Sequence, residues 1–261
     1  MDYTKLLENK RVFINTGQRG IGKDIALLFA RQGAIIALGG RNEQMLKQTM
    51  AEVQAISPKS KGYTFDLANG YDTQQALDKV LEDYGIIDIL VNTVGVNKQG
   101  MAHTVTDDDL EWMLETNYKS AIRCARKVLP GMMEQKSGNI INISSIHGSQ
   151  TMPNFTVYAG TKGAMNASAR AMALEYAPYG IRINNLAPGL ILSDNMMDEV
   201  LAFPEGEPRE KFMKLLTDMQ PLPIGSMENI SNTALFLASD MSAYITGQTI
   251  LVDGGASIKA H

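Results

Sequence analysis

Residues 11–22 read RVFINTGQRGIG, and this stretch decides the fold. The apolar run over residues 11–15 predicts a short buried strand. A glycine-rich turn over residues 16–22 follows it, and a helical pattern then continues to about Gln32. Strand, glycine turn and helix stand in the order of a phosphate-binding loop, because glycines let the backbone approach a pyrophosphate and the helix N-terminus offers N–H groups. A tight turn that binds nothing is the plain alternative.

The alternation of strand and helix continues over the rest of the chain. Strands are expected at 34–39, 61–66, 87–92, 138–145, 181–186 and 248–252. Helices are expected at about 43–56, 72–84, 106–130, 158–176 and 228–238. Such regular pairs predict βαβ units and a parallel sheet. Right-handed crossovers place the strand ends along one edge of the sheet, where ligands bind. Because the alternation continues over the chain, we expect one α/β domain over residues 1–261.

Composition narrows the class of protein. Of 261 residues, 44% are hydrophobic and 20% are charged, which supports a substantial core and argues against disorder. The net charge is −4 and no basic tract occurs, so nucleic-acid binding has little support. Residues 1–5 lack the basic and apolar segments of a secretory signal, and no apolar stretch approaches ~18 residues. We therefore expect a cytoplasmic protein with a small-molecule substrate and neither a nucleic-acid nor a membrane partner.

Cysteine and histidine offer no metal-binding pattern. Cys124 is the single cysteine and falls in a helical pattern, where a small buried residue is expected. The three histidines, His103, His147 and His261, are scattered, so no metal is expected. His147 comes two residues after Ser145. It either lines the rim of a site or is a plain loop residue.

The end of the second expected strand bears on the choice of cofactor. An acidic residue there would bind the 2′-hydroxyl of the adenosine ribose and favour NAD. Residues 39–42 read GGRN instead, and the first acid is Glu43. Arg41 and Arg19 offer guanidinium groups that suit a 2′-phosphate, which predicts NADP(H) in preference to NAD(H). Two solvated arginines are the alternative.

Tyr158 and Lys162 stand four residues apart, so a helix places both side chains on one face. A nearby ammonium favours the phenolate and lowers the pKa of the phenol. Such a tyrosine is able to pass a proton to or from a reacting oxygen. Ser145, at the end of an expected strand, would donate a hydrogen bond to the same oxygen. A solvated pair on a helix surface is the alternative to this catalytic site.

Asn117 falls on the apolar face of the helix that begins near Thr106. A buried amide needs hydrogen-bond partners. The residue is either a core asparagine bonded to backbone, or a residue that holds a water molecule beside the catalytic groups.

Residues 190–227, called the lid segment below, differ in composition from the rest. They contain five methionines, four prolines and a polar break, EGEP, at residues 205–208. Methionine is adaptable and suits a surface that closes over an apolar ligand, so we expect a small helical lid over the substrate. Ordinary gap-filling packing is the alternative.

Together these residues resemble the short-chain dehydrogenase/reductase family, in its 3-oxoacyl-thioester reductase-like branch, over nearly the whole chain. The likeness follows the family's order through the glycine turn, Asp66, residues 92–95, Asn117, Ser145, Tyr158, Lys162, Pro188, Gly189 and residues 244–255. It implies a Rossmann-type doubly wound parallel sheet of about seven strands in the order 3-2-1-4-5-6-7, with helices on both faces. It also implies a homotetramer, or a homodimer, built largely on the helices of Asn117 and Tyr158.

The resemblance also implies roles for single residues. Tyr158 would be the general acid/base, Lys162 would lower its pKa and hold the nicotinamide ribose, and Ser145 would orient the substrate oxygen. Asn117 would anchor a proton-relay water. The cofactor-binding residues would be Thr16, Gly17, Gln18, Arg19, Gly20, Ile21, Gly22, Arg41, Asp66, Leu67, Asn92, Gly95, Tyr158, Lys162, Pro188, Gly189, Ile191 and Ser193.

Two features depart from the family's pattern. The family usually places three residues between Thr-Gly and Gly-x-Gly, whereas only Gln18 and Arg19 intervene here. Either the loop is shorter, or residues 15–17 shift to fill the Thr-Gly-x positions. The second departure is Thr93-Val94, where the family usually has Asn-Ala.

The resulting hypothesis is an NADP(H)-dependent oxidoreductase that interconverts a ketone and a secondary alcohol by hydride transfer. A 3-oxoacyl thioester or a hydroxysteroid is the favoured substrate, and a sugar-acid or polyol dehydrogenase is the alternative. A non-catalytic NADP-binding regulator is the alternative from another class, although a sensor needs no acid/base pair. The sequence leaves the natural substrate, the reaction direction and the oligomer order open.

Overall fold

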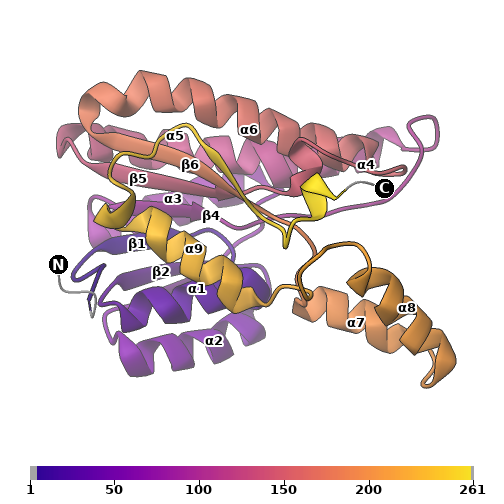
Figure 1. Ribbon diagram of the computed structural model, residues 1–261. Helices are drawn as coiled ribbons and strands as arrows, with labels where there is room; N and C mark the ends of the chain where they lie inside the picture. Colours follow the sequence, from indigo (N-terminus) through magenta and orange to yellow (C-terminus); the bar gives the residue numbers. More distant parts are fainter. Residues whose placement is uncertain (1–4, 260–261) are drawn as a thin grey trace.

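The computed structural model describes residues 5–259, and its sheet contains seven parallel strands (Figure 1). Their order is β3-β2-β1-β4-β5-β6-β7, so the expected Rossmann-type order is confirmed. The strands are β1 Arg11–Ile14, β2 Ile35–Gly40, β3 Lys61–Thr64, β4 Ile89–Asn92, β5 Gly138–Ile143, β6 Ile181–Pro188 and β7 Thr249–Val252. The helices are α1 Gly20–Arg31, α2 Glu43–Ile56, α3 Gly70–Tyr84, α4 Asp107–Leu114, α5 Ser120–Glu134, α6 Thr156–Tyr176, α7 Asp194–Ala202, α8 Glu207–Thr217 and α9 Met227–Ala238. Residues 1–4, which carry part of the expectation about a secretory signal, and His261 lie outside the described residues.

Helices cover both faces of the sheet. In Figure 1, α1, α2 and α9 lie on one side, and α3, α5 and α6 lie on the other. The alternation within β1 shows why both faces are apolar: Val12 and Ile14 pack with the first set of helices, whereas Phe13 packs with the second. All three side chains are 0% exposed. Because a parallel sheet is buried on both faces, its strands are continuous apolar runs rather than alternating ones.

Polar side chains cap several helices where their patterns begin. At the start of α2, Asn42 Oδ1 accepts the N–H of Met45 at 2.9 Å. At the start of α4, Thr106 Oγ1 accepts the N–H of Asp109 at 3.2 Å. Such caps satisfy N–H groups that have no partner within the first turn. The start of α1 differs, because Arg19 makes no side-chain cap there, and its first N–H groups remain for atoms outside the helix.

A row of buried asparagines crosses the sheet near the carboxyl ends of the strands. Asn15 Nδ2 donates to Asn92 Oδ1 at 2.9 Å, and Asn92 Nδ2 donates to Asn142 Oδ1 at 2.8 Å. The row continues from Asn142 Nδ2 to Asn185 Oδ1 at 3.0 Å, and from Asn185 Nδ2 to Thr249 Oγ1 at 3.1 Å. The four amides are at most 2% exposed, so each needs its neighbour as a partner. The row thereby aligns the ends of the central strands at the edge where the site forms.

The lid segment consists mainly of α7 and α8, which lie beyond the sheet at the lower right of Figure 1. Its two ends meet where the N–H of Leu192 donates to the carbonyl oxygen of Gly225 at 2.9 Å. The rings of Phe203 and Phe212 stack with centroids 4.3 Å apart and join the two helices. The segment is therefore closed at its base and held together by aromatic packing. Within residues 5–259, none of the helices combines the length and the apolar character that a bilayer crossing needs.

Candidate active site

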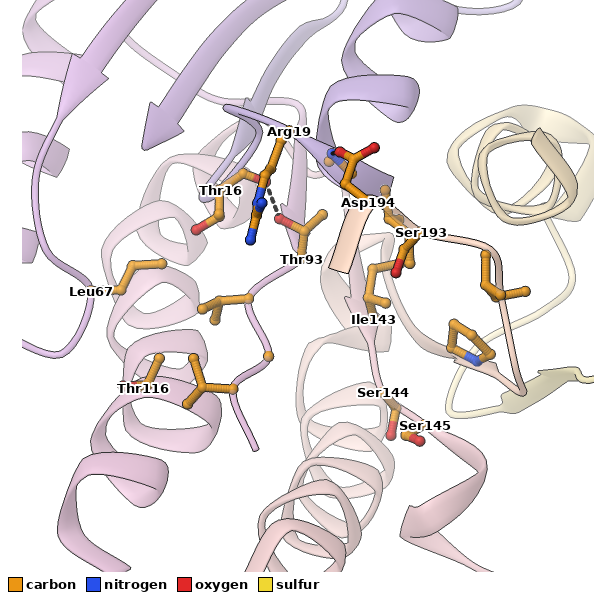
Figure 2. Close-up of a pocket in the computed structure, with 18 of the residues that line it drawn as sticks. Thr16, Arg19, Leu67, Thr93, Thr116, Ile143, Ser144, Ser145, Ser193 and Asp194 are labelled. Atoms are coloured by element: carbon orange, nitrogen blue, oxygen red, sulfur yellow. Dashed lines mark hydrogen bonds between the residues drawn. The ribbon is translucent and has the colours of Figure 1, made fainter. Parts of the chain in front are cut away.

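A cleft opens at the carboxyl ends of the strands, between the glycine turn, α6 and the start of the lid segment (Figure 2). Its volume of about 490 Å³ is within the range of small-molecule sites. Most residues expected to bind a cofactor line it, namely Thr16, Gln18, Arg19, Gly20, Ile21, Gly22, Arg41, Asp66, Leu67, Gly95, Tyr158, Lys162, Pro188, Gly189, Ile191 and Ser193. Ser145 lines it as well, whereas Gly17, Asn92 and Asn117 are not among the lining residues that the structure describes.

The glycine turn shows how the chain accommodates the missing residue. Asn15 points inward, where its Oδ1 accepts the N–H of Thr93 at 2.9 Å, and Thr16 lines the cleft. Gly17 faces β2, because a Cβ at this position would lie 2.3 Å from Leu38 Cδ1. These contacts favour the second of the two arrangements considered from the sequence, in which residues 15–17 fill the Thr-Gly-x positions.

Thr93, the other departure from the family's pattern, contacts the glycine turn through a hydrogen bond. Its hydroxyl donates to the carbonyl oxygen of Thr16, as the dashed line in Figure 2 marks. The neighbouring Asn92 is expected from the resemblance to line the cofactor, but its amide lies in the buried row between Asn15 and Asn142. The side chain of Asn92 is thus committed to the sheet, and the cleft is lined by Thr93, Val94 and Gly95 instead.

Two glycines shape the start of α1. A Cβ on Gly22 would lie 1.9 Å from the carbonyl oxygen of Thr16, so the first turn of α1 packs directly on the glycine turn. Gly20 has a φ of +63°, in the left-handed region that glycine adopts readily. Its N–H donates to Asp194 Oδ2 of the lid segment at 3.0 Å. A helix N-terminus that has no cap from its own preceding residue, and that the backbone approaches closely, fits the pyrophosphate of a dinucleotide.

The end of β2 lies where the adenosine ribose is expected. Gln18 Oε1 accepts the N–H of Asn42 at 2.7 Å, and a Cβ on Gly40 would lie 2.9 Å from the same oxygen. Gln18 therefore fills the space that an acidic side chain at position 40 would need. Arg41 Nη1 lies 4.0 Å from Asp66 Oδ2, and the Arg41 side chain is 72% exposed. Because such an exposed pair is weak, this guanidinium is available to a phosphate.

Ser145, Tyr158 and Lys162 meet at one wall of the cleft. Ser145 follows β5 and lines the cleft with Tyr158, and its hydroxyl accepts the N–H of His147 at 3.2 Å. Lys162 lies one turn further along α6, with Nζ 5.7 Å from the centre of the Tyr158 ring. Lys162 is 1% exposed, and its ammonium donates to the carbonyl oxygen of Ile143 at 2.9 Å. The spacing of four residues on a helix thus places both side chains in one cleft with the strand-end serine.

The electrostatics of this wall differ from the expectation. Burial raises the pKa of Tyr158, and the nearby Ser145 hydroxyl offsets only part of that rise. Burial also lowers the pKa of Lys162 to about 8. The phenol is therefore not brought toward neutrality by Lys162 alone, because desolvation penalises the charged form of both groups. The sequence pattern predicts the proximity of the two side chains, but it carries no information on the depth of their burial.

Asn117 lies in a π-helical turn, Glu115–Lys119, between α4 and α5. Its side chain is 0% exposed, and its Oδ1 accepts the N–H of Val96 at 2.8 Å. Its Nδ2 donates to the carbonyl oxygen of Val96 at 2.8 Å and to Thr161 Oγ1 at 3.2 Å. The core-asparagine alternative therefore describes its side chain, whose amide ties the segment after β4 to α6.

Thr116, Trp112 and Asp194 are among the further residues that line the cleft without having been singled out in the sequence. Thr116 Oγ1 is buried and has no hydrogen-bond partner among the described residues. A signal existed for Asp194, since Ser193 caps α7 and the next residue of a capped helix lies at its exposed start. No periodic pattern distinguishes Thr116 from its neighbours.

His147 is not among the described residues that line the cleft, but its ring lies beside that of Tyr158. Its ring stacks on Phe155 at 4.3 Å and meets the edge of Tyr158 at 5.7 Å, measured between ring centroids. Its Nδ1 lies 2.9 Å from Thr151 Oγ1, and burial lowers its pKa. The ring therefore packs as a neutral aromatic group against the tyrosine.

Comparisons with known proteins agree with this architecture. A family model described as enoyl-(acyl carrier protein) reductase matches residues 16–257. The 3-oxoacyl-[acyl-carrier-protein] reductase FabG of Staphylococcus epidermidis is 32% identical over 255 residues, which cover 95% of this chain and 98% of the relative. The structure of ElxO with NADP bound is 27% identical, with a TM-score of 0.87 and coverage of 96% of this chain and 100% of that chain.

A levodione reductase structure is 26% identical, with a TM-score of 0.89 and coverage of 97% of this chain and 100% of that chain. The matched sequence extends from the glycine turn to the last strand and includes the whole cleft. Sequence, sheet order and comparisons therefore agree, and the chain is an oxidoreductase that belongs to the short-chain dehydrogenase/reductase family.

Proposed function

We propose that this enzyme reduces a ketone to a secondary alcohol with NADPH, and that a 3-oxoacyl thioester is its substrate class. The observation that carries the proposal is the meeting of Ser145, Tyr158 and Lys162 in the cleft that the glycine turn also lines. A proton donor and a dinucleotide-type turn in one cleft are the parts that carbonyl reduction needs. The reverse oxidation uses the same groups in the opposite sense. Residues 1–261 are proposed to act as one catalytic domain.

Each residue of the wall has a defined task in this proposal. The nicotinamide, when bound, supplies the hydride to the carbonyl carbon. Tyr158 gives the proton of its hydroxyl to the carbonyl oxygen, and its raised pKa keeps that proton in place before the reaction. Ser145 orients the same oxygen by donating to it. Lys162 is held at the carbonyl oxygen of Ile143. Its ammonium supplies positive potential beside the Tyr158 phenol as the phenol loses its proton.

Several features of the cleft support NADP(H) in preference to NAD(H). The end of β2 is Gly40, and Gln18 fills the space where an acid would bind a free 2′-hydroxyl. Arg19 and Arg41 both line the cleft, and guanidinium groups suit a 2′-phosphate. The solved relative with NADP bound points the same way. Titration with both cofactors tests this choice, and tighter binding of NADH than of NADPH contradicts it.

The substrate class rests on the lining and on the relatives. Leu190, Ile191 and Met196 make the lid side of the cleft apolar, which suits an acyl chain better than a sugar acid. The curated relative acts, by its name, on a 3-oxoacyl group carried by acyl carrier protein. A small cyclic diketone is the second candidate, because the levodione reductase structure is of comparable similarity.

A substrate panel tests the proposed function. Consumption of NADPH is followed with a 3-oxoacyl thioester, a 2-enoyl thioester, a cyclic diketone, a steroid ketone and a sugar acid. The proposal expects the highest kcat/KM with the 3-oxoacyl thioester. A preference for the enoyl thioester or the diketone would transfer the substrate assignment, and the absence of turnover with every ketone would favour the non-catalytic regulator.

We also propose a homotetramer or homodimer that packs through the helices of Asn117 and Tyr158. Support comes from the outward face of α6, where Ala167, Ala171 and Leu174 are exposed at helical spacing. Leu174 is 81% exposed, which is unusual for a leucine that stays in water. Light scattering of Leu174→Glu against the parent protein tests the assembly, which should dissociate in the variant.

A further inference from the structure

The lid helix α7 contacts the glycine turn at two consecutive residues. Asp194 Oδ2 accepts the N–H of Gly20 at 3.0 Å, although the two residues are 174 positions apart. One turn further along α7, Asp198 Oδ2 lies 3.6 Å from Arg19 Nη1. Figure 2 shows Asp194 beside Arg19 at the top of the cleft. Two carboxylates of the lid segment therefore lie against the start of α1.

The groups that they contact are those that cofactor phosphates would bind. Gly20 carries the first N–H of α1, and the preceding Arg19 makes no side-chain cap. The partial positive charge of a helix N-terminus attracts a carboxylate or a phosphate at the same place. A guanidinium likewise binds either anion. Asp194 and Asp198 thus lie where the pyrophosphate of a cofactor, and the negative charge that neighbours it on the cofactor, are expected.

We propose that Asp194 sets the affinity for the cofactor by competing with its pyrophosphate for the N-terminus of α1. This inference rests on the proposed function, because it requires a dinucleotide at the glycine turn. Two anions repel each other and one N–H cannot serve both fully, so a bound pyrophosphate displaces the carboxylate. Because Asp194 is the first residue of α7, its displacement also removes one of the two contacts of this helix with the glycine turn. Cofactor binding and lid position are thereby linked, and the linkage is reciprocal.

The base of the lid segment allows such a movement. Ser193 caps α7 from within, since its side chain accepts the N–H of Met196 at 3.3 Å. The Leu192–Gly225 hydrogen bond holds the two ends of the segment together. The helix therefore keeps its cap and its anchor when Asp194 leaves Gly20.

A purely structural role for Asp194 is the alternative, in which its carboxylate only caps the start of α1. That role predicts that removal of the charge lowers the stability of the protein without tightening cofactor binding.

The test compares Asp194→Asn with the parent enzyme. The amide oxygen still accepts the N–H of Gly20, but the negative charge is gone. NADPH affinity is measured through the fluorescence of Trp112, the single tryptophan, which lines the cleft. The proposal expects about two- to fivefold tighter binding, the range of one charge at a helix end. The gain should shrink at high salt, because the competing charges are screened.

Matched controls separate this effect from a general change in charge. Glu205→Gln removes one charge from the same segment at a side chain that is 90% exposed, and it should leave affinity unchanged. Asp194→Glu keeps the charge and should bind NADPH as the parent does. ADP-ribose, which carries the pyrophosphate without nicotinamide, should gain affinity in Asp194→Asn, whereas adenosine should not.

The outcomes distinguish the inference from the function on which it rests. If the parent binds NADPH and Asp194→Asn binds it equally or more weakly, the inference is overturned and the proposed function stands. If neither protein binds NADPH, the proposed function falls and the inference falls with it. Tighter binding in Asp194→Asn alone, for NADPH and ADP-ribose, supports the inference.

Discussion

Lys162 Nζ donates to the carbonyl oxygen of Ile143 at 2.9 Å and also lies 3.5 Å from the carbonyl oxygen of Val94. The ammonium thus joins the end of β5 to the segment after β4 through a side chain of α6. It does so at 1% exposure, so the enzyme keeps a buried amine beside Tyr158 at a cost in stability.

Lys162→Met should abolish activity and yet raise the free energy of unfolding at pH 7 by roughly 1–2 kcal/mol, which is the desolvation cost less the lost hydrogen bonds. Burial lowers the pKa of Lys162 from 10.5 to about 8. Between these two pH values the unfolded chain holds the proton and the folded protein does not, so the wild type gains stability as the pH rises. The advantage of the variant should therefore shrink above pH 8, by at most about 1.4 kcal/mol per pH unit.

Urea unfolding of both proteins between pH 7 and pH 10 measures this difference. Other groups that titrate in that range are common to both chains and cancel. A difference that stays constant across the range would show that the ammonium is not desolvated in the folded enzyme.

Gly22→Ala should lower the free energy of unfolding by about 3 kcal/mol or more, because backbone atoms cannot move as a flexible side chain can. The added Cβ would lie 1.9 Å from the carbonyl oxygen of Thr16 and 2.9 Å from Gly17 Cα. Gly160→Ala is the matched control, since its Cβ would meet nothing within 4 Å and α6 is a regular helix there. That variant should gain about 0.5–1 kcal/mol from helix propensity. Equal effects of the two substitutions in thermal unfolding would contradict the packing described for the turn.

Thr116→Val should stabilise the protein by about 1 kcal/mol and weaken NADPH binding by about five- to tenfold. The hydroxyl is buried without a partner among the described residues, so its removal relieves a desolvation cost. Thr116 lines the cleft, where a bound cofactor would provide the missing partner for this hydroxyl. Thr116→Ser keeps the hydroxyl and should keep the affinity. Unchanged binding in Thr116→Val, measured by calorimetry, would remove Thr116 from the cofactor site.

The sequence predicts the sheet well because its signals are local. Each strand of a parallel sheet is an apolar run, and caps such as Asn42 and Thr106 mark helix starts within a few residues. The order of the strands in the sheet does not follow from these local signals. Periodicity predicts the elements, whereas the order 3-2-1-4-5-6-7 came with the family resemblance.

The site is predictable where a helix or a strand end brings the groups together. Ser145, Tyr158 and Lys162 are of this kind, since a strand end and one helical turn fix their places. Gly17 and Asn92 are not, because the face that a turn or strand-end residue presents depends on packing partners elsewhere in the chain. Contacts such as that of Asp194 with Gly20 join segments 174 residues apart and depend on the path of the lid segment. The raised pKa of Tyr158 depends on burial, which spacing does not encode.

The most direct test of the account is the turnover of Tyr158→Phe with NADPH and a 3-oxoacyl thioester. The account predicts a loss of kcat of at least about a hundredfold, the usual worth of a general acid, with NADPH affinity nearly unchanged. Tyr71→Phe, at a side chain that is 72% exposed, serves as the control and should match the parent enzyme. Substantial turnover by Tyr158→Phe, with the control intact, would contradict the assignment of Tyr158 as the proton donor.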